Sequence, residues 1–168
     1  MIAALLLSVD FNNFKYTHDP CSSNVPVPVV MQNGGFSYTD PHDQSVGFDL
    51  HVDRVVEGSL SPRTRHAIVI IECQLPAGEG GMAAAYLYAE HGNTAVYVDT
   101  VGEAEWGPDW GEGQETIHVR FTDKFLYVDR CNEVFHCLDD NVYVVTTYAL
   151  RNGKIVKVYE ETHKRAAP

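Results

Sequence analysis

Short runs of β-branched and aromatic residues, separated by turn-forming pairs, are the main pattern along this chain. Two Asn-Gly pairs each join two such runs: Asn33-Gly34 joins residues 27–32 to 35–38, and Asn152-Gly153 joins residues 142–151 to 154–161. Both residues of an Asn-Gly pair tolerate positive φ, which tight turns between antiparallel strands require. The pattern therefore predicts β-hairpins at both positions.

Two more turns extend this pattern through the middle of the chain. Gly92-Asn93 joins residues 83–91 to 94–101, Asp123-Lys124 joins residues 116–122 to 125–130, and two further long runs cover residues 46–56 and 66–75. No segment shows a sustained helical period with capping residues, although residues 1–14 have room for a short helix. The expected fold class is all-β, or mainly β with a short N-terminal helix, built as an antiparallel hairpin meander.

Side-chain alternation predicts which faces of the hairpins are buried. A two-residue loop at Gly92-Asn93 places Tyr88 opposite Tyr97 and Leu87 opposite Val98, so that one face carries tyrosines. The other face carries Leu87, Ala89, Val96 and Val98 and is predicted to be core. The final hairpin is apolar on both faces. One face carries Tyr148, Leu150, Ile155 and Tyr159, and the other carries Val145, Val156 and Val158. Because both faces must be covered, we expect a closed barrel or a layered sandwich.

Prolines and chain length complete the expected organisation. Pro26 and Pro28 each remove a backbone donor, which places the strand at residues 25–31 at a sheet edge or beside a bulge. The 168 residues suit a single β domain over residues 1–168. No apolar stretch is long enough to cross a bilayer, and the longest covers residues 2–7. Residues 1–8 are either a signal-peptide remnant or a segment docked on the core.

The charge balance limits the classes of partner. The chain has 12 Lys and Arg against 23 Asp and Glu, a formal net charge of -11. Such a charge repels phosphate backbones and anionic lipid surfaces. It therefore disfavours nucleic acid and leaves basic proteins, cations and neutral polymers such as glycans as partners.

The four cysteines are Cys21, Cys73, Cys131 and Cys137, an even number that suits two disulfides in an oxidising compartment. Cys131 and Cys137 flank a short segment that closes readily, which leaves Cys21 for Cys73. Buried free thiols are one alternative. A metal site of Cys131, Cys137 and His136 is another, but this spacing differs from the C-x2-C of zinc sites. We expect disulfides, with no metal and no cofactor.

Short motifs over most of the chain carry a resemblance to a protein family. They are VDFNNFKY at residues 9–16, the lone Cys21, NGGF at 33–36, VVEGSL at 55–60, the strand ending in Cys73, TTY at 146–148 and NGK at 152–154. In these motifs the chain resembles small secreted bacterial domains and is similar to the mycobacterial LppP/LprE-type lipoproteins. The resemblance implies an exported or lipid-anchored protein and no particular activity. In those proteins an acidic loop follows the G-x-L motif. Residues 61–65 read SPRTR here, so a calcium role for this loop is not implied.

Motifs of known catalytic centres are absent from the sequence: there is no G-x-S-x-G, H-E-x-x-H, Walker or Rossmann pattern. Three positions have a histidine beside a charged residue, namely His18 near Asp19, His42 beside Asp43, and His118 alternating with Arg120. Each is interpreted as a surface or capping histidine. Glu72 lies in an apolar strand, where a raised pKa would suggest catalysis, but we expect it to face solvent.

Residues 102–115 form a loop longer than a hairpin turn, and it holds both tryptophans and five carboxylates. They are Trp106, Trp110, Glu103, Glu105, Asp109, Glu112 and Glu115. Two indoles four residues apart suit stacking on sugar rings or anchoring of a protein, and the carboxylates suit calcium or a basic side chain. The alternative is that the indoles cap an open end of the fold while the acids are solvated. We take Trp106, Trp110, Glu103, Asp109 and Glu112 as the candidate binding residues.

Two classes of function remain. The first is a non-enzymatic binding or inhibitory module of the bacterial envelope, secreted, periplasmic or lipid-anchored, which resembles the small disulfide-bearing lysozyme inhibitors of the periplasm. The second is a small-ligand- or metal-binding β-barrel domain, with or without hydrolytic activity. A filled core with a projecting acidic loop favours the first class. A deep apolar cavity or a cluster of His and carboxylate groups favours the second.

Overall fold

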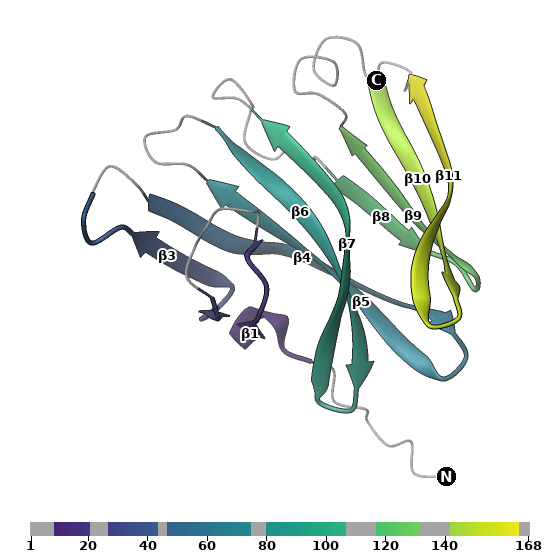
Figure 1. Ribbon diagram of the computed structural model, residues 1–168, viewed down its shortest axis with the longest axis horizontal. Helices are drawn as coiled ribbons and strands as arrows, with labels where there is room; N and C mark the ends of the chain where they lie inside the picture. The colour runs from purple at the N-terminus through teal and green to yellow at the C-terminus, as the bar shows by residue number, and fades with distance from the viewer. Residues whose placement is uncertain are drawn as a thin grey trace.

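The chain folds into antiparallel β-sheets (Figure 1). The computed structural model describes residues 9–20, 27–43, 47–74, 80–106, 117–131 and 142–164. A five-stranded sheet has the order β3 (Gly35–Thr39), β4 (Gly47–Ser61), β5 (Thr64–Gln74), β6 (Gly81–His91), β7 (Thr94–Trp106). A four-stranded sheet has the order β11 (Lys154–Lys164), β10 (Val142–Arg151), β9 (Phe125–Cys131), β8 (Ile117–Phe121). The N-terminal segment adds a 3-10 helix, η1 (Phe11–Asn13), and a small sheet of β1 (Lys15–Tyr16) and β2 (Val29–Val30). The all-β prediction is confirmed.

Three of the predicted hairpin turns lie where the sequence places them. At Asn152-Gly153 both residues have positive φ, 52° and 74°, and β10 pairs with β11. At Gly92-Asn93 the glycine has φ of 66°, and β6 pairs with β7. At Asp123-Lys124 the amide of Thr122 donates to the carbonyl of Phe125 at 2.8 Å. Local turn chemistry was therefore sufficient to predict these connections.

The Asn33-Gly34 turn also has positive φ, 52° and 82°, and it pairs Gln32 with Gly35 in an antiparallel bridge, so the tight turn is where the sequence predicts it. The pairing ends at this bridge, and the strands on either side of the turn belong to different sheets. The strand before it, β2, pairs with β1, and the strand after it, β3, pairs with β4. Two further backbone hydrogen bonds hold the turn, one from each side. The Gly34 amide donates to the Asn12 carbonyl at 2.8 Å, and the Gly34 carbonyl accepts from the Val52 amide at 2.7 Å. The turn thereby ties the N-terminal segment to the five-stranded sheet.

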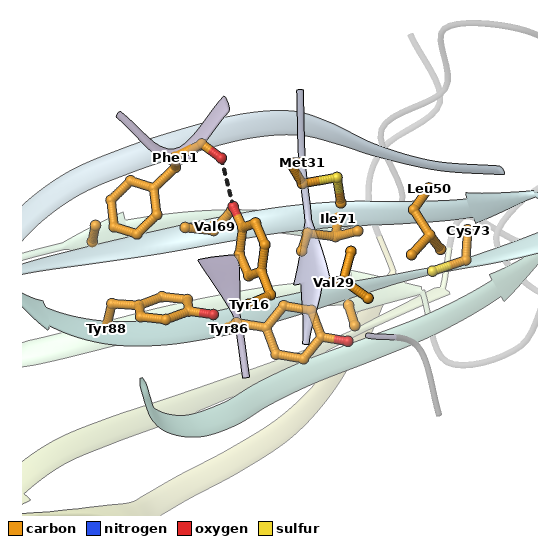
Figure 2. Packing of buried hydrophobic residues seen from close by; sticks show 12 residues of the cluster. Phe11, Tyr16, Val29, Met31, Leu50, Val69, Ile71, Cys73, Tyr86 and Tyr88 are labelled. Atoms are coloured by element: carbon orange, nitrogen blue, oxygen red, sulfur yellow. Dashed lines mark hydrogen bonds between the residues drawn. The ribbon is translucent and has the colours of Figure 1, made fainter. Parts of the chain in front are cut away.

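The five-stranded sheet is covered on both faces. The four consecutive residues 68–71 of β5 are at most 2 % exposed, although alternate side chains point to opposite faces. On one face Val69 and Ile71 pack with the N-terminal segment (Figure 2). On the other face Ile68 and Ile70 belong to a core shared with the four-stranded sheet. A strand buried on both faces reads as a continuous apolar run, which is the pattern of residues 67–71.

Burial on both faces changes the interpretation of the β6–β7 hairpin. Of the predicted aliphatic core, Leu87 is buried, but Val96 near the turn is 58 % exposed. The tyrosine face is buried too, with Tyr86 at 2 % and Tyr88 at 1 % exposure. The N-terminal segment covers this face, and the Tyr16 hydroxyl donates to the Phe11 carbonyl at 2.8 Å within it (Figure 2). The buried hydroxyl therefore keeps a hydrogen-bond partner, as burial requires.

The two larger sheets pack face to face, so the architecture is the sandwich of the two predicted alternatives. No sheet closes into a barrel within the described residues. Two glycines allow the sheets to approach closely. A Cβ atom at Gly58 on β4 would overlap the ring of Phe121 on β8. A Cβ atom at Gly102 on β7 would lie 2.8 Å from Cγ1 of Val128 on β9.

Two strand registers predicted from the turns are wrong, because each strand pair contains a β-bulge. Tyr88 pairs with Tyr97 as predicted, but Leu87 pairs with Asp99, because Val98 is an extra residue in β7. In the last hairpin, the shift between Thr147 and Tyr148 moves Tyr159 opposite Thr147. Tyr159 was predicted to share the face of Tyr148, but it lies on the other face. A bulge has no turn signal in the sequence and reverses the alternation beyond it.

Two predicted features extend beyond the described residues. The proposed loop at residues 102–115 begins later than predicted, because residues 102–106 belong to β7 and pair with β6.

Neither Cys73 nor Cys131 is a free thiol. Their predicted partners, Cys21 and Cys137, lie outside the described residues, and so the pairing stays a prediction.

We expect Gly58→Ala to lower the free energy of unfolding by about 1–3 kcal/mol, because the added methyl group overlaps Phe121 between the sheets. Gly35→Ala is the matched control, since its Cβ atom would meet only ordinary contacts at 3.9 Å or more. Both substitutions reduce the entropy of the unfolded chain equally, so this effect cancels in the comparison. Equal stabilities of the two variants in denaturant titrations would contradict the close sheet approach.

Candidate binding site

A polar cleft lies where the edge strand of one sheet meets the other sheet. It has a volume of about 300 Å³ and is lined by Thr100, Val101, Gly102 and Glu103 of β7, Arg130 of β9 and Tyr148 of β10. The β7 bulges shape this wall, because the register shifts by one residue before Tyr86 and again before Tyr88 of β6. Bulges re-aim side chains at a sheet edge and are frequent beside binding sites.

Hydrogen bonds and charges fix the polar groups of the cleft. The Tyr148 hydroxyl donates to the Val101 carbonyl at 2.8 Å, which links the two sheets. Burial raises the pKa of Tyr148; nearby Arg130 opposes this effect, and the carboxylates of Glu160 and Asp99 add to it. Arg130 lies 3.9 Å from a Glu160 oxygen. The cleft therefore presents a guanidinium, a neutral phenol and carboxylates, which suits recognition of polar groups.

Edge strand β7 carries an excess of carboxylates. Asp99, Glu103 and Glu105 are exposed along it, and residues 94–106 contain no Lys or Arg. Trp106 is the last residue of the same strand. Two candidate binding residues, Glu103 and Trp106, are thereby placed on β7, and Glu103 reaches the cleft wall. The other three, Trp110, Asp109 and Glu112, lie outside the described residues, as does Glu115.

His18 is held in a cage of tyrosine rings over the five-stranded sheet. Its imidazole stacks on Tyr97 with centroids 4.4 Å apart and lies at the same distance from Tyr86. Nδ1 is 3.3 Å from the Tyr88 hydroxyl, while Nε2 is buried without a hydrogen-bond partner. Burial lowers the pKa of His18 to about 4, against the opposing charge of Asp19. The ring is therefore neutral at pH 7 and packs as an aromatic group, which differs from the surface histidine expected.

The other singled-out residues do not join a common site. Glu72 Oε2 accepts from His51 Nε2 at 2.8 Å, and this hydrogen bond raises the pKa of His51. The predicted solvent-facing carboxylate thus has a partner on β4, but it remains partly exposed. His42 is exposed, and its amide donates to Asp40. His118 is on β8 of the four-stranded sheet, whereas His51 is on β4 of the five-stranded sheet.

Sequence reasoning missed the cleft and one buried carboxylate. Neither Arg130 nor Tyr148 was among the candidate site residues, and they meet β7 only because the two sheets pack together. Glu90 is 6 % exposed, with its Oε2 3.7 Å from Arg65 and its Oε1 buried without a partner. Burial raises the pKa of Glu90, the charge of Arg65 opposes this effect, and Glu57 adds to it. Its position two residues before Gly92 of the turn gave no signal of burial.

Neither metal-binding geometry, nor a membrane span, nor similarity to known proteins assigns a function to the described residues. In the parts of the chain that the structure describes, no three His, Cys, Asp or Glu side chains are grouped to hold a metal ion. Those parts also contain no helix with the length and apolar character to cross a membrane. No protein-family model, no curated protein and no solved structure matches the chain. The similarity to LppP/LprE-type lipoproteins therefore stays a prediction.

We expect the free energy of unfolding to decrease as pH is lowered from 7 to 4, in part because of His18. Because its pKa is lower in the folded chain than the ordinary 6.5, the unfolded chain binds the proton first as pH falls. The contribution of His18 is thus present above pH 6.5 and is lost towards pH 4, by up to about 3 kcal/mol. His18→Phe keeps a ring in the cage and removes this contribution.

The measurement is the free energy of unfolding of wild type and His18→Phe at several values between pH 4 and 7. The variant should show a shallower decrease over this window. His42→Phe replaces an exposed histidine and serves as control. Parallel pH curves for wild type and His18→Phe would show that the imidazole is not buried in a neutral form.

Proposed function

We propose that this protein is an exported, non-enzymatic binding module of the bacterial envelope that captures a basic protein along strand β7. The observation that carries the proposal is the run of exposed carboxylates, Asp99, Glu103 and Glu105, on an edge strand without a cation. A field of one sign at a sheet edge steers an oppositely charged partner and raises the association rate. The net charge of -11 acts in the same direction.

The filled interior supports a role in binding through the surface. Side chains of both faces of the five-stranded sheet are buried at a few per cent exposure or less, and they form two packed clusters. The cleft beside β7 is open and polar, and Tyr148 braces it through the Val101 carbonyl. Glu103 and Glu105 alternate with Gly102 and Ala104, which face the four-stranded sheet, so their carboxylates lie on the other side of β7 from the cleft. A regular paired strand that carries them offers a preorganised surface, which reduces the entropy cost of binding.

A small ligand in the cleft is the second candidate function, favoured by its volume of about 300 Å³ and its lining by Arg130 and Tyr148. The two functions differ in what they require. A small polar ligand would depend on Arg130, whereas a basic protein would be repelled by it and would depend on the carboxylates of β7. Comparison of Arg130→Met with Glu105→Gln therefore separates them.

For the basic-partner function we expect saturable binding to a C-type lysozyme, the probe that the similarity to lysozyme inhibitors suggests, with an affinity that falls as salt rises. Glu103→Gln and Glu105→Gln should each weaken binding by about 0.2–1 kcal/mol at low salt. Trp106→Ala and Trp110→Ala should each weaken it by about 1–3 kcal/mol without loss of fold. Isothermal titration calorimetry gives the affinity, and thermal unfolding reports the fold.

The control variant is Asp123→Asn, which removes one exposed carboxylate from the β8–β9 turn. It should bind like wild type if the position of the charge matters. Cytochrome c serves as a second basic protein that tests selectivity. Lack of binding to both proteins, or equal losses for Asp123→Asn and Glu105→Gln, would contradict a site on β7. Large losses of melting temperature in the tryptophan variants would indicate that the indoles cap the fold.

For the exported state we expect two disulfides, Cys21–Cys73 and Cys131–Cys137. Non-reducing peptide mapping by mass spectrometry after aerobic purification identifies the linked peptides. Removing either pair should lower stability by about 2–5 kcal/mol, as is usual for native disulfides of secreted domains. Four free thiols in that experiment would contradict the pairing and weaken the case for export.

A further inference from the structure

The outer face of the four-stranded sheet carries a row of aligned side chains that the proposed β7 site does not use. Leu126 and Val128 of β9 point into the core between the sheets, so that Tyr127 between them points outward. Across the strands Arg120 pairs with Tyr127, Tyr127 with Thr147, and Thr147 with Tyr159. Residues in register share one face. These four residues are called the tyrosine row.

The ring of Tyr127 is held from two sides. The Arg120 guanidinium carbon lies 4.5 Å from the ring centroid, in a cation–π contact on the β8 side. The ring of Phe125 lies 6.3 Å away with an edge contact. Arg120 therefore covers the side of the Tyr127 ring that faces β8. The side that faces β10 and Thr147 stays open to a ligand.

The second ring of the row reaches the surface through the β11 bulge. Tyr159 is 57 % exposed, and its hydroxyl donates to Glu161 Oε2 at 3.1 Å. This hydrogen bond and the negative charge of Glu161 raise the pKa of the phenol. An exposed aromatic ring whose hydroxyl is tethered loses little freedom when a ligand stacks on it. Thr147 lies between the two tyrosines, and because it is small and only 8 % exposed, it does not fill the space between their rings.

Spacing and chemistry indicate the class of ligand. Tyr127 and Tyr159 are two strands apart in one register row, a separation of about 10 Å, close to the length of a disaccharide unit. Pyranose rings present apolar C–H faces that pack on aromatic rings and hydroxyls that bond to planar charged groups. The neighbouring row supplies such groups, since Asp129 and Glu161 both pair with Val145 of β10. Arg120 offsets one of these two negative charges.

We propose that the tyrosine row binds a neutral, extended oligosaccharide, with pyranose rings packed against Tyr127 and Tyr159 across Thr147. The net charge of -11 disfavours polyanions at this face, and neutral sugars carry no such penalty. This site lies on the other sheet from β7 and does not depend on the function proposed for β7. A module with both surfaces would hold a glycan and a basic protein at once.

The test is titration of the intact protein with cellohexaose and chitohexaose, followed by two-dimensional NMR. At least one of them should bind with micromolar to millimolar affinity and shift the signals of Thr147 and its neighbours. Tyr159→Ala should reduce the association constant about tenfold or more, while Tyr159→Phe, which keeps the ring, should stay within about threefold of wild type. Tyr127→Leu, which keeps an apolar side chain at the half-buried position, should also lose about tenfold.

Glu105→Gln and Val96→Ala alter exposed positions of β7 and serve as controls with unchanged sugar affinity. No binding of either sugar at millimolar concentration would overturn the proposal. Binding that Tyr159→Ala leaves intact and Glu105→Gln weakens would place the sugar at β7 and also overturn it. A dimer in sedimentation experiments that Tyr159→Ala dissociates would show that a second copy of the chain covers this face, against the proposal.

Discussion

Burial of the five-stranded sheet on both faces is the constraint on which the rest of the structure depends. Strands β5 and β6 lie in the middle of that sheet, and consecutive residues of each point into different cores. One core needs the four-stranded sheet and the other needs the N-terminal segment. Each fully buried aliphatic side chain contributes about 1.5–3 kcal/mol, so neither layer can be removed without a large loss of stability. The fold therefore requires all three layers together.

This constraint explains where the glycines and the tyrosine hydroxyls lie. The sheets approach most closely at Gly58 and Gly102, where a side chain would enter the opposite sheet. On the other face the thin N-terminal layer fills its space with large rings, and the Tyr16 hydroxyl finds a carbonyl within the same layer. His18 joins these rings because its neutral form packs as an aromatic group. The interior thus leaves the chemistry of recognition to the strands at the sheet edges and to the open sheet face.

The sequence predicted the strands and three hairpins because their signals are local. Asn152-Gly153 and Gly92-Asn93 act through backbone dihedral angles, and the apolar run of β5 acts through its own burial. The candidate site was predicted only in part. Glu103 and Trp106 lie on β7, but Arg130 and Tyr148 become neighbours of Glu103 through packing of two sheets that are distant along the chain. No local pattern encodes such a contact.

The errors of register in β7 and β11 share one physical origin, the β-bulge, which also links the fold to the proposed surfaces. A bulge adds one residue to a strand and exchanges its two faces beyond that point, while the partner strand and the core stay in place. In β11 it exchanges Tyr159 for Glu160, so that the tyrosine lies outside and the carboxylate accepts from Thr146 at 2.9 Å on the inner side near Arg130. In β7 the first bulge places Asp99 opposite Leu87, on the side of the four-stranded sheet, and the second places Val101 in the core. Single extra residues in edge strands thus place rings and carboxylates on the surface. The central strands are buried on both faces and cannot expose such side chains.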